Sequence, residues 1–586
     1  MTESWPPAMR DTTVVEVKGY TNGDDCFLAW IEPNTPGCRG FEIRRDLKLA
    51  KGGTSSILLD NYVGFAKDHP TVHEHRPSTD WPFQRYTWTD HGVSEGDVAS
   101  YTITPMMATP GGLVPNLAQA GHSGPLRVTS AASSQEWAYF NRGVVLSQFM
   151  TRRLPVNFTN ADLIKLKNDL AVDDNDLRKF LTGQLGARLV KLLDDAKTHG
   201  WHVYAALYEL DDDRLVNGLI ALGQNAHVLL ANGSKKTKPA DGNAAAAARL
   251  AGHVDLTRRM LWSAGLGHNK FLVVCKNATD PIAVWTGSTN WATTGLCTQM
   301  NNAVFIRSTP IARTYLEQWH RLHDDELVAP DGKAKHFLPP LMTSNDQPKA
   351  GGQGASGKWT AWFTRTSNRQ DIAAASAVID GAQDAILFLM FEPGSNGLRQ
   401  VVEARMTPGK PTFKAGLYIH GVVNTLHPGG GKVDVTTVAH GDTTTIDLRV
   451  VEPEGVGVNL AEWAKEVTRR DFILGQGGVI GHAIIHSKII VVDPFTKPVV
   501  ITGSHNFSTP ASESNDENLL IIRDSPGLAE RYAVNIMSTY QHYRWRAYLR
   551  DCMVKNKPPF SALHDDDTWQ KKLPEHNPEL KFWLQK

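Results

Sequence analysis

The feature that most constrains this chain is a pair of matched segments, residues 268–302 and 484–518. Each segment holds a His-x-Lys triplet, an apolar run, a turn, a second apolar run and then Gly-Ser-x-Asn. Short β-branched runs on either side of a turn, such as Ile489–Val492 and Val499–Ile501, predict the two strands of a buried hairpin. A buried strand has no packing reason to carry a His two residues from a Lys. We therefore expect these polar side chains to converge on a functional site.

The spacing within the two segments agrees closely. The matched positions are His268 with His486, Lys270 with Lys488, Ser288 with Ser504, Asn290 with Asn506, and Asn302 with Asn518. Only the turn between the apolar runs differs in length. The copies lie too far apart for the period of a solenoid repeat, so the sequence predicts a duplicated domain. A strand, a helix and a strand precede each copy, at 204–231 and 385–422, and Glu209 and Glu392 end the first strand of each set.

The chain is long enough for several domains, and its texture changes along its length. Its 586 residues exceed the roughly 250–300 at which a single hydrophobic core stops growing. Residues 1–128 hold short β-type runs between Gly, Pro, Asn and Asp turns, which predicts an all-β sandwich with Trp30 in its core. Alternating helix and strand patterns then predict α/β structure. The expected divisions after the sandwich are a first half at 129–348, a Gly-rich linker at 349–357, a second half at 358–556 and a tail at 557–586.

Composition sets further limits. Lys plus Arg and Asp plus Glu both number 61, so no global field draws the chain onto nucleic acid or anionic membranes. The N-terminus lacks the basic start and apolar centre of a secretory signal, and no apolar run reaches the roughly 18 residues of a membrane span. We therefore expect a cytoplasmic protein, with export by a non-classical route left open. The five cysteines include no Cys-x-x-Cys pair, which argues against a disulfide framework or structural zinc site.

Paired His-x-Lys and Gly-Ser-x-Asn motifs are the signature of the phospholipase D superfamily, which this chain resembles across roughly residues 130–555. One triplet alone carries no information, whereas the doubled motif in matching context is specific. The resemblance implies two α/β/α halves related by a pseudo-twofold axis, with one active site at their seam. Each half would supply a His, a Lys and an Asn. The resemblance also implies a covalent phosphohistidine, later attacked by water or an alcohol, and no metal or cofactor.

The first copy departs from the family pattern at one position. The family motif ends in Asp five residues after the Lys, as Asp493 does after Lys488, but the first copy has Cys275 there. Strand alternation places this residue on the face opposite the Lys or at the turn. We therefore expect Asp493 to brace its hairpin rather than to contact the substrate. The loss puts the geometry of the first copy in question, not its chemistry.

Cleavage of a phosphodiester needs a nucleophile, a proton for the leaving oxygen and positive donors around the phosphate. Two imidazoles can supply the first two, because one can be neutral while the other is cationic near pH 7. Lys270 and Lys488 are expected to bind the nonbridging oxygens. Their expected helpers are Asn290, Asn506 and the hydroxyls of Ser288 and Ser504.

A difference between the copies predicts distinct roles for the two histidines. The group expected to orient a histidine, eleven residues after the Asn, is Asn301 in the first copy and Glu517 in the second. A neutral amide fixes an imidazole tautomer without favouring its protonation, whereas a carboxylate stabilises the imidazolium. We therefore predict that His268 is the nucleophile and that His486, backed by Glu517, is the general acid and then the general base. This agrees with the usual family assignment, and exchange of the two roles stays open.

The N-terminal segment from Val93 to Thr104 resembles the approach to the tyrosine corner of fibronectin type III and immunoglobulin-like domains, with Tyr101 as the tyrosine. The resemblance implies a sandwich of that type for residues 1–128. The sequence leaves three roles open for it, which are docking a protein partner, shaping the substrate entrance and stabilising the rest of the chain.

The predicted function is a phospholipase D-type phosphodiesterase that hydrolyses or transesterifies a phospholipid headgroup. The alternative is a metal-independent nuclease of the same superfamily acting on DNA or RNA, which the zero net charge disfavours. A third hypothesis, a non-catalytic binding scaffold, is disfavoured by the two complete catalytic sets. His482 and His486 have the spacing of zinc ligands on a helix, but the β-branched run around them indicates a strand. His505 is left open as a pocket residue or a filler of the hairpin.

Overall fold

The computed structural model of the chain forms two compact units, which we describe separately. The first is built from residues of 14–130 and 544–585, and the second from residues of 131–439 and 448–543. The structure describes residues 14–32, 35–71, 74–143, 159–234, 241–261, 265–325, 339–350, 357–394, 396–424, 434–439, 448–451, 484–554, 556, 560–571 and 577–585.

The first unit is an all-β sandwich, as the turn-rich N-terminal sequence predicts. Its strands are β1 (Glu16–Thr21), β2 (Cys26–Ile31), β3 (Cys38–Lys48), β4 (Thr54–Leu58), β5 (Asp60–Asn61), β6 (Arg76–Pro77), β7 (Thr87–Asp90), β8 (Val98–Thr109), β9 (Gly112–Pro115), β10 (Gly121–His122) and β11 (Leu126–Arg127). One sheet has the order β1-β2-β7 and the other β10-β8-β3-β4, with β9 and β11 also pairing with β8. The short strands β5 and β6 pair with each other.

The core of the sandwich is aromatic. Trp30 has no exposed surface, as predicted, and its ring meets that of Phe41 edge-on with 5.7 Å between centroids. Helix α15 (Asn577–Leu584) brings the Trp583 ring to 4.5 Å from that of Phe27. Residues expected to form a tail thus contribute to the core of this unit.

The tyrosine of the expected corner makes a different contact. The Tyr101 hydroxyl, in β8, donates to Oδ2 of Asp90 at 2.7 Å, and the Arg45 guanidinium pairs with both oxygens of the same carboxylate. In a tyrosine corner the hydroxyl bonds to a backbone oxygen instead. The sandwich is therefore present, and its fibronectin type III or immunoglobulin type stays a prediction.

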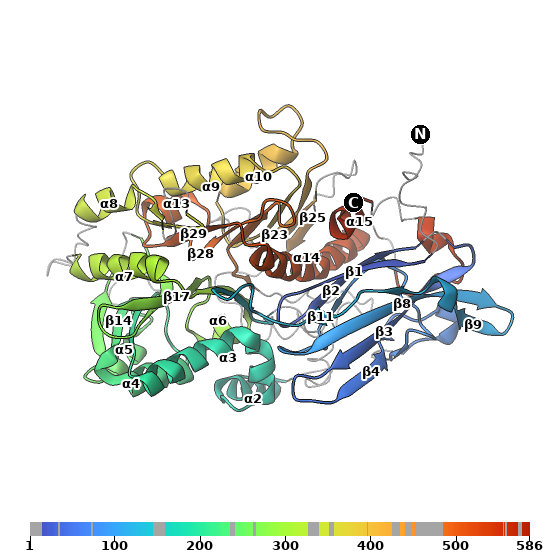
Figure 1. Cartoon of the computed structure of the whole chain (residues 1–586), viewed down its shortest axis with the longest axis horizontal. Helices are drawn as coiled ribbons and strands as arrows, with labels where there is room; N and C mark the ends of the chain where they lie inside the picture. Colours follow the sequence, from blue (N-terminus) through green and yellow to red (C-terminus); the bar gives the residue numbers. More distant parts are fainter. Residues whose placement is uncertain are drawn as a thin grey trace. The chain divides into compact units, whose positions relative to one another are not determined.

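The second unit contains two α/β halves. The first half holds strands β12 (Glu136–Phe140), β13 (His202–Leu207), β14 (Ala226–Ala231), β15 (Asp255–Arg259), β16 (Lys270–Cys275), β17 (Pro281–Gly287) and β19 (Asn302–Ile306). Its helices are α2 (Asn160–Ala171), α3 (Asp176–His199), α4 (Asp213–Leu222), α5 (Ala244–Leu250), α6 (Thr293–Cys297) and α7 (Thr309–Asp324). The strand order is β12-β19-β17-β16-β13-β14-β15, with α3 and α4 on one side of the sheet and α7 on the other (Figure 1).

The second half repeats this plan. Its strands are β20 (Lys349–Ala350), β21 (Trp359–Phe363), β22 (Ala385–Met390), β23 (Tyr418–Val423), β24 (Asp434–Ala439), β25 (Leu448–Val451), β27 (Ile489–Val492), β28 (Val499–Gly503) and β29 (Asn518–Arg523). Its helices are α8 (Pro339–Asn345), α9 (Gln370–Asp380), α10 (Leu398–Met406), α13 (Thr509–Glu513) and α14 (Pro526–Val554). The expected linker at 349–357 begins with β20, and most of it lies outside the described residues.

The two sheets share one strand order. In the second half it is β20-β21-β29-β28-β27-β22-β23-β24-β25, so that β21-β29-β28-β27-β22-β23 matches β12-β19-β17-β16-β13-β14. The halves meet where β18 (Gln299–Met300) pairs in parallel with β26 (Ile484–Ile485). Helix α7 of the first half reaches the second, since Tyr315 meets Phe363 edge-on at 5.1 Å. The predicted pair of matched α/β halves is confirmed.

Candidate active site

The two hairpins place the His-x-Lys triplets at matching positions. Lys270 is the first residue of β16 and Lys488 directly precedes β27, so each histidine lies just before its strand begins. Lys270 Nζ donates to the His268 carbonyl at 2.7 Å, and Lys488 Nζ donates to the His486 carbonyl at 2.5 Å. All four residues are at most 5% exposed. The duplicated motif therefore builds a duplicated local structure.

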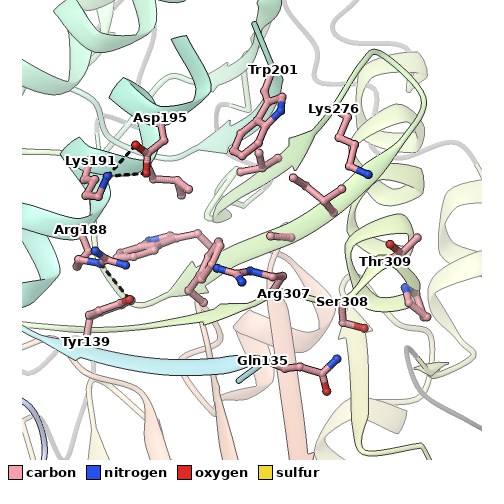
Figure 2. Close-up of a pocket in the computed structure, with 17 residues that line it drawn as sticks. Gln135, Tyr139, Arg188, Lys191, Asp195, Trp201, Lys276, Arg307, Ser308 and Thr309 are labelled. Atoms are coloured by element: carbon pink, nitrogen blue, oxygen red, sulfur yellow. Dashed lines mark hydrogen bonds and ion pairs between the residues drawn. The ribbon is translucent and has the colours of Figure 1, made fainter. Parts of the chain in front are cut away.

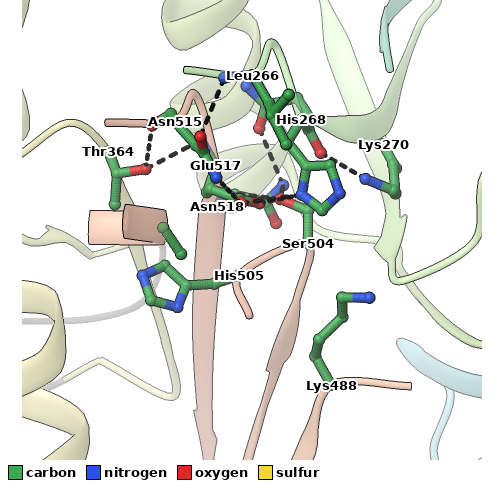
Figure 3. Close-up of polar contacts among 12 residues, drawn as sticks. Leu266, His268, Lys270, Thr364, Lys488, Ser504, His505, Asn515, Glu517 and Asn518 are labelled. Atoms are coloured by element: carbon green, nitrogen blue, oxygen red, sulfur yellow. Dashed lines mark hydrogen bonds and ion pairs between the residues drawn. The ribbon is translucent and has the colours of Figure 1, made fainter. Parts of the chain in front are cut away.

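Each histidine is held by a side chain from the other half. Nδ1 of His268 lies 2.9 and 2.8 Å from the two carboxylate oxygens of Glu517 (Figure 3), and Nδ1 of His486 lies 2.8 Å from Oδ1 of Asn301. The predicted support of His486 by Glu517, within one copy, is therefore wrong. Asn301 and Glu517 directly precede β19 and β29 at the seam, where the pseudo-twofold arrangement directs each toward the opposite histidine. Both contacts use Nδ1, which leaves Nε2 as the nitrogen available for reaction.

The hydroxyls of Ser288 and Ser504 bond to residues next to the histidine supports. Ser288 Oγ donates to Asn301 Oδ1 at 2.8 Å and accepts the Asn302 backbone N–H at 3.0 Å. Ser504 Oγ accepts the Asn518 backbone N–H at 3.0 Å. Neither serine has exposed surface. In this structure both hydroxyls bond to residues at or just before the start of β19 and β29, and their predicted contact with substrate stays a prediction.

The paired amides Asn302 and Asn518 also cross the seam. Asn302 Nδ2 donates to Thr502 Oγ1 at 2.8 Å, and Asn518 Oδ1 accepts from Thr286 Oγ1 at 2.8 Å. Thr286 and Thr502 are matched residues of β17 and β28. Each half therefore binds the other through the same pair of positions, which fits the supporting role predicted for these amides.

A buried ionic network anchors the loop that carries His268. Arg259 Nε donates to Asp516 Oδ2 at 2.5 Å, and its Nη2 donates to Asp325 Oδ2 at 2.8 Å. The His268 backbone N–H donates to the carbonyl oxygen of Asp516 at 2.9 Å. The residue before Glu517 thus joins the two halves by charge and by backbone. Nothing in the motif spacing indicated this network.

Asn290 and Asn506 are the remaining matched amides. Asn290 Nδ2 donates to Glu209 Oε2 at 2.5 Å, so Glu209 belongs to the site although the sequence only singled it out as a strand end. The Oδ1 atoms of Asn290 and Asn506 are both buried and have no hydrogen-bond partner among the described residues. A buried amide oxygen without a partner costs free energy, which is a common mark of a ligand site.

Sequence analysis missed a matched pair of aromatic side chains. The Tyr208 ring lies 4.6 Å from the His268 ring and 4.8 Å from Lys270 Nζ. The Phe391 ring lies 4.7 Å from the His486 ring and 4.5 Å from Lys488 Nζ. Tyr208 and Phe391 directly follow β13 and β22 and directly precede Glu209 and Glu392. Their position beside those glutamates was the available signal.

Burial shifts the pKa of every central ionisable group. It lowers the pKa of His268 and His486 well below the usual value, and the charges of Lys270 and Lys488 lower it further. Burial also lowers the pKa of Lys488 well below its usual value and that of Lys270 to about 7, and it raises the pKa of Glu517 to about 7. These cations are crowded and poorly hydrated, so a bound phosphate anion would favour their protonated forms.

A third histidine fills the hairpin of the second half. His505 has no exposed surface, its Nε2 lies 2.8 Å from Asp371 Oδ2, and its Nδ1 accepts the Phe507 backbone N–H at 2.8 Å. Phe507 has a positive φ of 59°, so this bond holds the strained turn that carries Asn506. His505 is thus a positioning residue beside the site.

Asp493 lies at the far end of β27 from Lys488. Its carboxylate accepts the backbone N–H groups of Gln383, Asp384 and Ala385 at 2.7–2.9 Å. These bonds fix the entry to β22 and fit the predicted bracing role. Cys275, its counterpart, is fully buried.

The described residues contain no group of three or more His, Cys, Asp and Glu side chains placed to hold a metal ion. His482 of the considered zinc pair lies outside them. In the same described part, no helix is both long and apolar enough to cross a membrane.

Comparisons with known proteins agree with the paired motifs. Residues 454–539 match the family model described as "Cardiolipin synthase, PLD-like domain". The chain is 44% identical over 73 residues to a phospholipase D of Rickettsia bellii and 48% identical over 52 residues to that of Rickettsia conorii. These stretches cover 12% and 9% of this chain and 33% and 24% of the relatives, so it spans at most a third of their length.

Among solved structures, phosphatidylserine synthase of Haemophilus influenzae is similar at 11% identity and a TM-score of 0.38, covering 68% of this chain and 93% of that one. A TM-score this low indicates only a distant similarity. The matched family model includes the second hairpin, and the first half contains a matching hairpin. These comparisons support the resemblance of this chain to the phospholipase D superfamily.

Proposed function

We propose that this chain is a phosphodiesterase that cleaves a phospholipid headgroup through a covalent phosphohistidine. The observation that carries this proposal is the crossed support of two buried histidines, His268 by Glu517 and His486 by Asn301, beside two buried lysines. An acceptor on Nδ1 fixes the tautomer in each ring and directs reactivity to Nε2. Lys270 and Lys488 supply positive charge for the nonbridging oxygens, so the proposed chemistry requires no metal.

In the first step, Nε2 of His268 attacks phosphorus while the bond from phosphorus to the leaving oxygen breaks. His486, protonated once the anionic substrate is bound, gives its Nε2 proton to that oxygen. The new P–N bond leaves positive charge on the His268 ring. Glu517 stabilises this charge, because its carboxylate accepts the Nδ1 proton.

In the second step, the now neutral His486 takes a proton from water or an alcohol. The oxygen of that acceptor bonds to phosphorus, and the electron pair of the P–N bond returns to Nε2 of His268. Asn301 holds His486 without stabilising its cation, which keeps His486 a strong acid in the first step. His268 stays the proposed nucleophile, but for a different reason: Glu517 holds His268 and would stabilise its phosphorylated ring, instead of holding the general acid.

Trapping the intermediate tests these roles. Enzyme incubated with a radiolabelled phosphodiester and quenched with detergent at alkaline pH, where the P–N bond of phosphohistidine is stable, should carry phosphate on His268, mapped by peptide analysis. Phosphate on His486 would exchange the roles, and no labelled histidine would sink the covalent mechanism.

A phospholipid is the proposed substrate, because the matched family model is described as cardiolipin synthase and the relatives are named phospholipase D. The zero net charge also disfavours nucleic acid. We expect choline release from phosphatidylcholine in EDTA, lost in His268→Ala. Added ethanol separates transfer, which yields phosphatidylethanol, from hydrolysis. EDTA-resistant nicking of plasmid DNA without choline release would favour the alternative, a nuclease.

A further inference from the structure

A pocket lies in the first half, on the α3 side of its sheet, with a volume of about 760 Å³ (Figure 2). Its walls come from the sheet strands β12, β16, β17 and β19 and from α3. That volume is within the range of small-molecule sites. The reaction proposed above uses none of its residues.

The pocket lies away from the catalytic seam. Lys270 begins β16 at the seam, whereas Val274 and Lys276 line the pocket at the other end of that strand. Six residues of extended chain separate Lys270 from Lys276, which is roughly 20 Å. A ligand in the pocket would therefore not occupy the reaction centre.

The floor of the pocket is apolar. The side chains that form it are Leu192, Val274, Ile282, Ala283, Trp285 and Phe305. Trp285 is 2% exposed, and its ring stacks on that of Tyr139 with 5.2 Å between centroids. An apolar floor of this kind gains free energy when a hydrocarbon group covers it.

Basic side chains surround this floor. They are Arg188, Lys191, Lys276 and Arg307. Lys191 pairs with Asp195 at 2.7 Å, and Lys276 has only a distant ion pair with Asp280 at 4.0 Å. Within the described part of the chain, no carboxylate pairs with Arg188 or Arg307. Arg188 Nε donates to the Tyr139 hydroxyl at 3.3 Å.

The duplicated half shows that the fold does not require this pocket. By the shared motif positions, Trp285 and Phe305 correspond to Ile501 and Ile521, and Tyr139 corresponds to Trp362. The residues of the second half form a closed hydrophobic core with α9 and α10. Ile521 is 1% exposed, whereas Phe305 is half-buried. Within the described residues, the matching face of the second half is closed where that of the first half is open.

We propose that this pocket binds an anionic amphiphile, with a hydrocarbon chain on the apolar floor and a phosphate group at Arg188 and Arg307. Charge complementarity indicates an anion, because four basic side chains line the pocket and Asp195, which pairs with Lys191, is the one carboxylate among the lining residues. The apolar floor assigns the chain. The site is separate from the catalytic seam, so this proposal does not depend on the proposed reaction.

The contacts of the rings favour a hydrocarbon chain over nucleic acid bases. Tyr139 and Trp285 stack on each other, and Trp201 stacks on His199 with 4.5 Å between centroids. Tyr139 and Trp285 are each only 2% exposed, so they present little free ring face on which a base could stack. Proteins that bind single strands rely on exposed aromatic faces.

Equilibrium dialysis of radiolabelled dodecyl phosphate, below its micelle concentration, tests the proposal on the full chain. We expect Arg188→Gln/Arg307→Gln to weaken binding by about tenfold, since two charge-assisted contacts are lost. Lys197→Gln is the matched control, because Lys197 is exposed on the same helix and does not line the pocket. It should bind like the parent chain. Leu192→Glu, which places a charge on the floor, should also weaken binding.

The remaining ligands separate the competing explanations. Inorganic phosphate should bind the parent chain much more weakly than dodecyl phosphate does, and dodecyl maltoside should not compete. Equal binding of dodecyl phosphate by the double variant and the parent would overturn the proposal. So would equal competition by dodecyl maltoside, or stronger competition by a single-stranded oligonucleotide. Sedimentation with anionic vesicles, lost in the double variant, would place the amphiphile in a membrane; binding of the monomer alone would identify a free ligand.

Discussion

The two halves of the second unit share one backbone plan, but their histidines have different supports. In the first half His268 is held by the Glu517 carboxylate, and in the second half His486 is held by the Asn301 amide, each at 2.8 Å. Because each support comes from the opposite half, neither half alone contains a complete histidine site. Matching contacts join the two halves, and the two histidines differ because one is held by a carboxylate and the other by an amide.

Removing each histidine in turn should give the largest difference in turnover between the two halves. With p-nitrophenyl phosphorylcholine, the leaving phenolate needs no proton, so the general acid is dispensable in the first step. His268→Ala should lose turnover by on the order of 10⁴-fold and release no burst of nitrophenol. His486→Ala should release about one equivalent per site and then stop, because the second step lacks its base. Stopped-flow absorbance measures both.

One result of this experiment would contradict the assigned roles of the two histidines. A burst from the His268→Ala protein, with none from His486→Ala, would show that the two histidines exchange roles. Circular dichroism and thermal unfolding of both variants should match the parent chain and serve as the control for folding.

Neutralising the single carboxylate should have the next largest effect. Glu517→Gln retains an acceptor for Nδ1 of His268 but removes the charge that stabilises the phosphoryl-imidazolium, so kcat should fall by roughly a hundredfold. Asn301→Asp is the reciprocal change. It should raise the pKa of His486 and move the alkaline limb of the kcat profile to higher pH, with about a tenfold loss from the weaker acid. Equal losses without any shift of the profile would remove the distinction between the halves.

Much of this arrangement could be predicted from the sequence. The repeat of His268 and Lys270 at His486 and Lys488 indicated two matched halves, and β-branched runs indicated the buried hairpins. The partners of the histidines could not be predicted, because residue spacing places Asn301 and Glu517 before their strands without telling which half they face. Each support reaches the histidine of the opposite half because the halves meet where β18 pairs with β26, a contact between segments distant in the sequence. The open pocket depends on side-chain packing under α3.

The affinity of the site for anions should depend on pH, because Lys270 from the first half and Glu517 from the second both titrate near neutral pH. Burial brings the pKa of Lys270 to about 7 and raises that of Glu517 to about 7. Below pH 7 the lysine is cationic and the carboxyl neutral, which favours an anion; above pH 7 both changes oppose it. Sulfate keeps its charge throughout, so its affinity should fall by about tenfold per pH unit above 7 for each linked proton. Calorimetric titration between pH 6 and 9 measures this, and Lys270→Met should weaken and flatten the dependence. A constant affinity in the parent chain would contradict the shifted values.

The smallest effects concern the one position where the family motif differs between the halves. In the second half the Asp493 carboxylate accepts three backbone N–H groups, including those of Gln383 and Asp384. In the first half the corresponding N–H groups, of Gly200 and Trp201, bond to carbonyl groups in the last turn of α3. Two of the three donors therefore have other acceptors in the first half, which helps to explain how it can lack the aspartate.

Asp493→Ala should accordingly destabilise the unit by about 1–3 kcal/mol, because buried N–H groups lose their acceptor. Cys275→Ala should cost about 1 kcal/mol or less, since it removes only a small buried sulfur. Differential scanning calorimetry should record the larger drop in Tm for Asp493→Ala, while kcat of both variants stays within about twofold because neither residue contacts the histidines. A drop in Tm for Cys275→Ala as large as that for Asp493→Ala would mean that the α3 carbonyls do not replace the missing carboxylate.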